Sequence, residues 1–167
     1  MMDLFEAIEK RRSVRLFQTH PVPLEDLKKI VNAGRLAPSG YNLQKREFII
    51  ITDRSILNRL NDVQPVFDCG GAIAVIVEPT KYAVEDASAA IENMLLAATA
   101  LGYGSCWVQG TLIPNEKWVK ELLGIPKEKR LFALIPIGIP LTYGEQAPKK
   151  PLEEITYLNY YGNKEGL

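Results

Sequence analysis

The segment from Glu85 to Leu101 constrains the fold of this chain more than any other. Its pattern predicts a long helix whose apolar side chains occupy nearly the whole circumference: Ala87, Ala89, Ala90, Ile91, Met94, Leu95, Leu96, Ala97 and Ala98. A helix of this kind is buried on several sides. In a chain of 167 residues, packing against a second subunit is the simplest way to bury it. The segment therefore predicts a homodimer.

The rest of the chain alternates between short apolar runs and amphipathic segments. The predicted strands are residues 48–52, 72–77, 104–108 and 131–137, and the predicted helices between them are residues 56–60 and 116–123. Near the N-terminus, Asp3 is placed to cap a first helix, and Pro23 begins a second helix that should stop near Gly34. The length suits one domain, over residues 1–167.

Composition disfavours several classes of protein. The 20 basic and 20 acidic side chains give a formal net charge of zero, so no overall field draws the protein to nucleic acid or to an anionic membrane. The apolar runs are too short to span a bilayer, and the N-terminus is charged rather than an apolar leader. Cys69, Cys106 and the single His20 lack the spacing of metal ligands. We therefore expect a cytoplasmic protein with two buried, reduced thiols and no metal site.

Three arginines and a serine lie within five residues, in the run Arg11-Arg12-Ser13-Val14-Arg15. Guanidinium groups match phosphate oxygens in shape and keep their charge at working pH. The run is also compatible with a solvated basic face at a helix end, where cations complement the helix dipole. By itself the run leaves both interpretations open. The residues that favour an anionic ligand come later, at positions 37–44 and at Lys149-Lys150.

Few side chains of this sequence suit acid–base or nucleophilic chemistry. Gly102-Tyr103-Gly104 lacks the third glycine of a dinucleotide-binding turn, and it follows a helix instead of a strand. No glycine-rich loop ends in Lys-Ser or Lys-Thr, and His20 has no carboxylate nearby in sequence to orient it. This balance favours a protein that takes its reactivity from a cofactor and has no catalytic side chain of its own.

The order of several motifs resembles that of the flavin-dependent nitroreductase family. The arginine run follows a short helix, and a second helix leads to Ala37-Pro38-Ser39-Gly40-Tyr41-Asn42-Leu43-Gln44, which is similar to the family's Pro-Ser-x-x-Asn-x-Gln loop. The match continues through the Ala-rich helix, Gly104-Ser105-Cys106-Trp107, Pro136-Ile137-Gly138 and Lys149-Lys150-Pro151. The resemblance implies an α+β, nitroreductase-like fold, with a central, mostly antiparallel sheet of four to five strands flanked by helices.

The resemblance also implies a homodimer with two FMN molecules at the subunit interface. The arginine run and the lysine pair would meet the phosphate and the pyrimidine edge, the loop would come from the other subunit, and backbone N–H groups at positions 109 and 110 would face flavin N5 and O4. The implied cofactor contacts are Arg11, Arg12, Ser13, Arg15, Pro38, Ser39, Asn42, Gln44, Trp107, Gln109, Gly110, Lys149 and Lys150. Tyr41 and Leu43 would border the substrate pocket.

The implied activity is hydride transfer from NADH or NADPH through FMN to a small planar acceptor, such as a nitroaromatic, a quinone or an enone, with ping-pong kinetics. Lys45 stands after the loop glutamine, where many members carry Trp, and the helical insertions that cover the site in larger members are missing. An open pocket is expected, and the acceptor stays undefined. A specialised dehalogenase or dehydrogenase of the same fold, and a flavin-binding protein without turnover, remain alternatives.

The C-terminal tail, residues 148–167, is polar and rich in proline but carries Ile155, Tyr157, Tyr160 and Tyr161. This composition is not that of a disordered segment. Residues 155–158 are β-branched and aromatic, which favours a short strand. We expect the tail to reach across the dimer and extend the partner's sheet.

Overall fold

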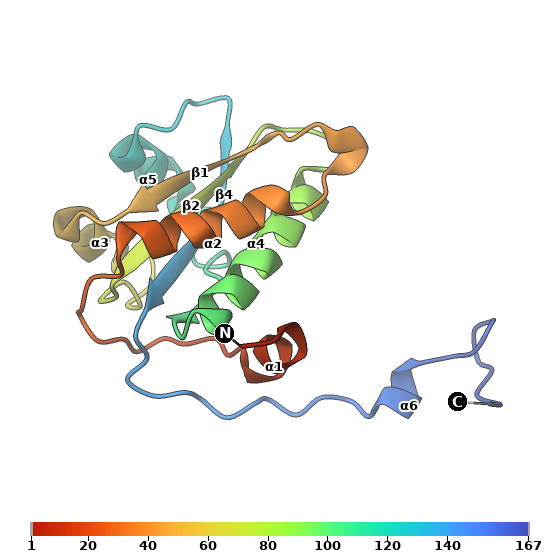
Figure 1. Ribbon diagram of the computed structural model, residues 1–167. Helices are drawn as coiled ribbons and strands as arrows, with labels where there is room; N and C mark the ends of the chain where they lie inside the picture. Colours follow the sequence, from red (N-terminus) through yellow and green to blue (C-terminus); the bar gives the residue numbers. More distant parts are fainter. Residues whose placement is uncertain (1, 167) are drawn as a thin grey trace.

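The protein is described by a computed structural model of residues 2–166, which contains a four-stranded sheet (Figure 1). The strands are β1 (Arg46–Ile51), β2 (Gly71–Val77), β3 (Gly104–Ser105) and β4 (Arg130–Gly138). Their order across the sheet is β1-β2-β4-β3, and every neighbouring pair is antiparallel. The predicted α+β fold with an antiparallel sheet is confirmed.

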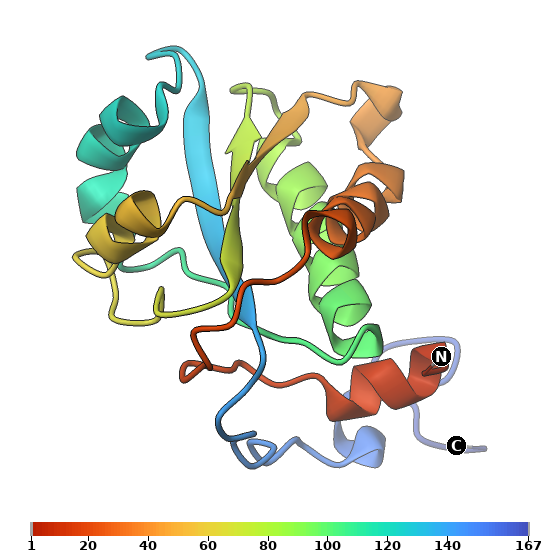
Figure 2. The same cartoon turned by 60° about the vertical axis from the view of Figure 1, so that its left-hand side comes forward.

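Helices cover both faces of the sheet (Figure 2). The helices of the chain are α1 (Leu4–Lys10), α2 (Leu24–Leu36), α3 (Arg54–Leu60), α4 (Ala83–Ala100), α5 (Glu116–Leu123) and α6 (Leu152–Ile155), with 3-10 turns at Gly40–Asn42 and Ile113–Asn115. The helices α2 and α4 lie on one face, and α3 and α5 lie on the other. Asp3 caps α1 as predicted, because its side chain accepts a hydrogen bond from the Glu6 backbone N–H at 2.9 Å.

The strand β2 shows why the sheet needs helices on both faces. All seven of its residues are buried. Side chains alternate along a strand, so Ala74 belongs to the core beneath α3 and α5, whereas Ile73 and Val75 belong to the core beneath α2 and α4. The continuous apolar run of the sequence therefore supplies two cores at once.

The helix α4 is enclosed by its own chain. The sheet, α2 and α1 pack against it and bury eight of its residues, among them Ile91 and Met94. A second subunit is therefore not required to cover this helix, contrary to the expectation from its composition. What remains partly exposed is a stripe that includes Leu96, which lines a groove together with Leu4 and Leu36. The homodimer itself stays a prediction.

Gly34 does not end α2, which continues to Leu36. It is buried in the contact between α2 and α4, where a Cβ would lie 2.8 Å from Met94 Cγ and 3.3 Å from the Ala90 carbonyl oxygen. The missing side chain lets the two helices approach closely. Close packing, and not helix termination, explains this glycine.

Two predicted strands differ from the observed ones. The strand β1 begins at Arg46 and forms an edge of the sheet, so its middle residues are half-buried rather than buried. The strand β3 covers only Gly104–Ser105, and Val108 pairs with Leu134 as an isolated bridge. The last residue pair between β3 and β4 is Ser105 with Ile137, and the next residue of β4 is Pro136. Because proline has no N–H to donate, the hydrogen-bond ladder between the two strands is interrupted there.

Within one chain the C-terminal tail runs away from the sheet, and residues 155–158 pair with no strand (Figure 1). Residues 152–155 form the short helix α6, because Pro151 stands at its N-cap and two glutamates occupy its first turn. The expected pairing of the tail with the sheet of a partner subunit stays a prediction. Exposed apolar side chains of the tail are Leu152, Ile155, Leu158, Tyr160 and Tyr161. Met1 and Leu167 lie outside the described residues.

Two further properties hold for the described part of the chain. Within residues 2–166, the helices are too short or too polar to cross a bilayer. Over the same residues, His, Cys, Asp and Glu side chains do not gather in threes that could hold a metal ion. Cys69 and Cys106 are buried free thiols, as the sequence predicts.

The substitution Gly34→Val should lower the free energy of unfolding by about 1–3 kcal/mol, because the added carbons meet Met94 and the Ala90 carbonyl in a packed contact. Urea denaturation measures this change. Asn32→Val, at an exposed position of the same helix, controls for the low helix propensity of valine. A loss at position 34 no larger than the loss at position 32 would contradict the close contact.

Candidate functional site

The arginine cluster (Arg11, Arg12 and Arg15) follows α1, where the chain runs beside β3. The Val14 backbone N–H donates to the Ser105 carbonyl at 2.9 Å, and Ser13 forms a parallel bridge with Ser105. Val14 is buried, whereas Ser13 and Arg15 are exposed, as expected from the alternation of side chains in an extended segment. The buried valine therefore anchors the run and turns its neighbours outward.

A cavity of about 290 Å³ lies against the arginine cluster. It is lined by the three arginines, Ser13, Lys149 and residues 144–147. Lys150 does not line it, so the structure brings only the first lysine of the predicted pair to this place. Glu145 is the acidic residue in the lining, against four cationic side chains. This donor set suits a phosphate group.

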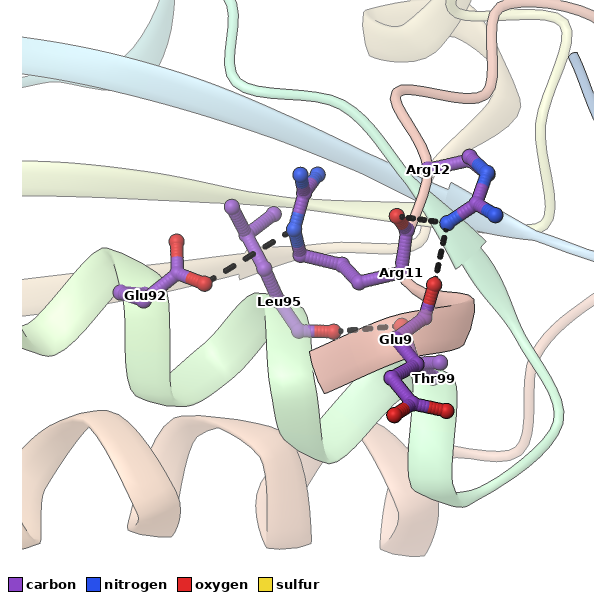
Figure 3. Close-up of polar contacts among 6 residues, drawn as sticks. All are labelled: Glu9, Arg11, Arg12, Glu92, Leu95 and Thr99. Carbon is purple, nitrogen blue, oxygen red and sulfur yellow. Dashed lines mark hydrogen bonds and ion pairs between the residues drawn. The ribbon is translucent and has the colours of Figure 1, made fainter. Parts of the chain in front are cut away.

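Each arginine of the cluster has a different environment, and Figure 3 shows those of Arg11 and Arg12. Arg12 turns back and donates to the carbonyl oxygens of Glu9, at 2.5 Å, and of Arg11, at 2.9 Å, so it caps the end of α1. The Arg11 side chain reaches along α4, and its Nε lies 3.7 Å from Glu92 Oε1. Arg15 Nη1 makes a long contact of 3.3 Å with the Ser13 carbonyl. Arg12 therefore fits the interpretation of a basic residue that complements the end of a helix. Arg11 and Arg15 keep most of their N–H donors free for a ligand.

The arginine cluster also acts on a neighbouring thiol. Burial raises the pKa of the Cys106 thiol above its ordinary value, and the positive charges of Arg15 and Arg11 oppose that rise. The thiol is therefore expected to be protonated at neutral pH, which fits a packing role. It supplies no nucleophile at the site.

The segment after β3 contributes Trp107, Gln109 and Gly110. Trp107 is half-buried, with its ring centroid 6.4 Å from that of Phe132, and its Nε1 donates to Gln109 Oε1 at 3.1 Å. This bond occupies the Gln109 side chain. Gly110 is exposed, and a Cβ there would meet no atom within 4 Å. The backbone at this point is therefore open to a ligand.

The loop of residues 38–44 connects α2 to β1 and has an unusual backbone. The backbone φ angles of Tyr41, Asn42 and Gln44 are 50°, 54° and 54°. These values lie in the left-handed region, which residues other than glycine rarely adopt. All three are exposed, as is Leu43. The Tyr41 ring lies 5.7 Å from the ring of Tyr82, at an interplanar angle of 60°.

One chain does not bring all the predicted site residues together. The 38–44 loop lies by the start of α4, whereas the arginine cluster lies by its other end, and both views agree on this (Figures 1 and 2). Arg11, Ser13, Arg15 and Lys149 form one group around the cavity. The segment that leads to Trp107 and Gln109 begins beside them, where Ser105 forms a bridge with Ser13. The loop residues form a second, separate group.

Two functional candidates escape the sequence analysis: Arg46 and Asp86, both buried beneath the 38–44 loop. The Gly40 backbone N–H donates to Asp86 Oδ1 at 2.8 Å, and Arg46 Nη1 donates to the Pro38 carbonyl at 2.8 Å. The sequence gives only a weak indication that these two residues are buried and functional. Arg46 is a charged residue directly before the apolar run of β1, and Asp86 is a charged residue in the first turn of a largely apolar helix.

Comparisons with known proteins agree with the architecture. The sequence profile of the Nitroreductase family matches residues 8–64 and 76–139. A candidate NADH dehydrogenase/NAD(P)H nitroreductase of Archaeoglobus fulgidus is 37% identical over 153 residues, which cover 84% of this chain and 87% of that protein. An iodotyrosine deiodinase of Thermotoga neapolitana is 26% identical over 185 residues, covering 93% and 96% of the two chains.

Solved structures have the same fold. A candidate NADH dehydrogenase/NAD(P)H nitroreductase from Parabacteroides distasonis superposes with a TM-score of 0.84 at 30% identity, covering 94% of this chain and 98% of that one. A BluB-like flavoprotein from Clostridium difficile superposes with a TM-score of 0.83 at 25% identity, covering 95% and 99%. The chain therefore belongs to the nitroreductase family of oxidoreductases, as the order of its motifs predicts.

Proposed function

We propose that the protein binds FMN between two subunits and, with it, transfers hydride from NADH or NADPH to a small planar acceptor. The observation that carries this proposal is the cavity on which Arg11, Arg15 and Lys149 converge. Bound FMN would supply the centre that accepts and gives up the hydride. The chain itself supplies binding, orientation and charge.

The phosphate of FMN is assigned to the cavity of the arginine cluster. Arg15 and Lys149 offer charge-assisted donors there, and Ser13 offers a hydroxyl. Arg11 lines the same cavity, and its Nε also lies 3.7 Å from Glu92 Oε1; we assign it to the pyrimidine edge of the flavin. A positive charge at that edge stabilises the negative charge that develops on hydride acceptance. Arg12 serves by holding the end of α1, and Lys150 is left without a role at the phosphate.

The remaining contacts are assigned to backbone groups and to the second subunit. The open backbone at Gln109 and Gly110 would face flavin N5 and O4, with Trp107 holding the Gln109 side chain aside. The 38–44 loop of the partner subunit would reach the ring and the ribityl chain with Pro38, Ser39, Asn42 and Gln44. Within one chain this loop lies by the start of α4, away from the arginine cluster. A homodimer is therefore part of the proposal.

The acceptor pocket is assigned to the exposed Tyr41 and Leu43 of the same loop. NADH or NADPH and the acceptor would use this one open pocket in turn. We therefore expect ping-pong kinetics. Nitroaromatics, quinones and enones fit a pocket that stacks planar molecules. The two buried free thiols agree with a reducing cytoplasm as the place of action.

A deiodinase-like reaction is the second candidate, because relatives named iodotyrosine deiodinase cover nearly the whole chain. Anaerobic assays separate the alternatives. Bleaching of the yellow protein by NADH or NADPH distinguishes an enzyme from a flavin-binding protein without turnover. Release of iodide from iodotyrosine by the reduced protein would favour the deiodinase over reduction of nitroaromatics or quinones.

The two lysines of the tail provide a matched pair of variants. Lys149→Ala and Arg15→Ala should each weaken FMN binding by about tenfold to a hundredfold, because a charge-assisted hydrogen bond contributes about 1.5–3 kcal/mol. Lys150→Ala should leave the dissociation constant unchanged, since its side chain does not line the cavity. Quenching of FMN fluorescence measures the constants. Equal effects of the two lysine variants would contradict the assignment of the phosphate to this cavity.

A further inference from the structure

The backbone of the 38–44 loop needs an external support. Three of its residues, Tyr41, Asn42 and Gln44, are in the left-handed region, and none of them is glycine. Such conformations cost free energy and persist only where the surrounding structure determines them. Within the loop, the Asn42 backbone N–H donates to the Ser39 carbonyl at 2.9 Å and the Leu43 backbone N–H donates to the Gly40 carbonyl at 3.0 Å. Ser39 Oγ accepts from the Gln44 backbone N–H at 3.1 Å, and Gln44 Nε2 makes a long contact of 3.5 Å with the Asn42 carbonyl. These local bonds do not attach the loop to the rest of the chain, and the attachment lies beneath it.

The Arg46 guanidinium lies directly beneath the loop and collects carbonyl groups from three elements. Its Nη1 donates to the carbonyls of Pro38 and Asp86, each at 2.8 Å. Its Nη2 donates to the carbonyl of Ala37 and makes a longer contact of 3.5 Å with that of Arg35. One planar group thus ties the end of α2 and the start of the loop to the first turn of α4. Arginine suits this task because its five donors form a rigid fork.

Asp86 supplies the second half of the support. Its Oδ1 accepts from the Gly40 backbone N–H at 2.8 Å, whereas its Oδ2 is buried and has no hydrogen-bond partner among the described protein atoms. Gly40 fits tightly here, since a Cβ would lie 2.5 Å from Tyr82 Cδ2. The loop is therefore pinned at Pro38 and at Gly40, directly before its three left-handed residues.

Both charged groups are largely removed from water. Arg46 is 9% exposed and Asp86 is 5% exposed. Burial lowers the pKa of the Arg46 guanidinium, and the negative charge of Asp86 opposes that shift. The guanidinium bonds the backbone carbonyl of Asp86 and not its carboxylate, which bonds the Gly40 backbone N–H. Each of the two buried side chains therefore holds the loop through backbone groups, and its removal leaves those groups without their partner.

We propose that Arg46 and Asp86 are positioning residues, which hold the 38–44 loop in the shape that receives the cofactor and the acceptor of the partner subunit. This proposal rests on the proposed function. Neither side chain touches the ligand. The two residues act through the loop, which presents the half-buried Ser39 and the exposed Asn42 and Gln44 to FMN, and the exposed Tyr41 to the acceptor. Preorganisation of this kind removes the cost of ordering a loop at the moment of binding.

Arg46→Met and Asp86→Ala test the proposal in the FMN-free protein. Hydrogen exchange of the Gly40 and Gln44 amides should accelerate at least about tenfold in both variants, because the loop then opens without opening the core. Arg54→Met is the matched control: Arg54 also binds a backbone carbonyl, that of Cys69 at 2.7 Å, but at α3, on the other face of the sheet. The control should leave the exchange of both loop amides unchanged.

Binding provides the second measurement on the same variants. The dissociation constant of FMN should rise about tenfold to a hundredfold in Arg46→Met and Asp86→Ala, and not in Arg54→Met. Arg46→Lys should recover part of the affinity, since an ammonium group satisfies some of the carbonyls but not all of them. Arg54 is exposed, so thermal stability is expected to fall more in Arg46→Met than in the control whatever the role of Arg46. A purely structural role would accelerate the exchange of core amides together with that of the loop amides, and the folded variant would bind FMN with the affinity of the wild-type protein.

The outcomes are distinct. Failure of the wild-type protein to bind FMN would overturn the proposed function. Binding by the wild-type protein, with loop exchange and affinity unchanged in Arg46→Met and Asp86→Ala, would overturn the positioning role alone. Should Arg46→Met fail to fold, Asp86→Ala carries the test, because alanine is a favourable residue in the first turn of α4. Unfolding of both variants would also overturn the proposal, since the pair would then hold the whole fold and not the loop.

Discussion

The burial of α4 between the sheet, α2 and α1 is the packing interaction on which the rest of the structure depends. Its 18 residues span about 27 Å at the rise of an α-helix. Asp86 in its first turn holds the 38–44 loop, Glu92 in its middle contacts Arg11, and α1 with the arginine cluster lies toward its last turn. One rigid element therefore sets where both groups of the candidate site lie.

Because the two groups of candidate residues lie toward opposite ends of α4, the proposed site requires residues from two subunits. The arginine cluster and the segment of Trp107 and Gln109 lie side by side because Val14 pairs with Ser105 at the end of β3. The 38–44 loop shares no lining residue with the cavity of the arginine cluster. In the proposed dimer, the loop of one subunit would meet the cavity of the other, and a ligand that needs both groups would bind there. The groove lined by Leu4, Leu36 and Leu96 is an apolar surface that is available for such contact.

Much of the fold was predictable because its elements carry strong local patterns. The apolar run of β2, the Asp3 cap and the periodicity of residues 116–123 identify their elements directly. The differences arise where tertiary contacts decide. The helix α2 ends near Gly34, as predicted, but the glycine itself serves a helix–helix contact, and Pro136 of the neighbouring strand β4 shortens β3. Neither contact is encoded in the local sequence.

The candidate site was only partly predictable for the same reason. Motif order identified the arginine run and the loop, but the distinction between Lys149 and Lys150, the capping role of Arg12 and the support by Arg46 and Asp86 depend on three-dimensional placement. A formal charge of zero also conceals a local cluster of four cationic side chains around one cavity. Charge at a site is a matter of geometry rather than of composition.

Subunit complementation tests the central claim, that each site combines the arginine cluster of one chain with the loop of another. Arg15→Ala and Asn42→Ala chains, carrying different tags, are co-expressed and the mixed dimer is purified. The account predicts one intact site and one doubly defective site in each mixed dimer, and hence about half of the wild-type FMN content, although each variant alone binds little. A mixed dimer that binds no more FMN than the two separate variants would place both groups of each site in one chain and contradict the account.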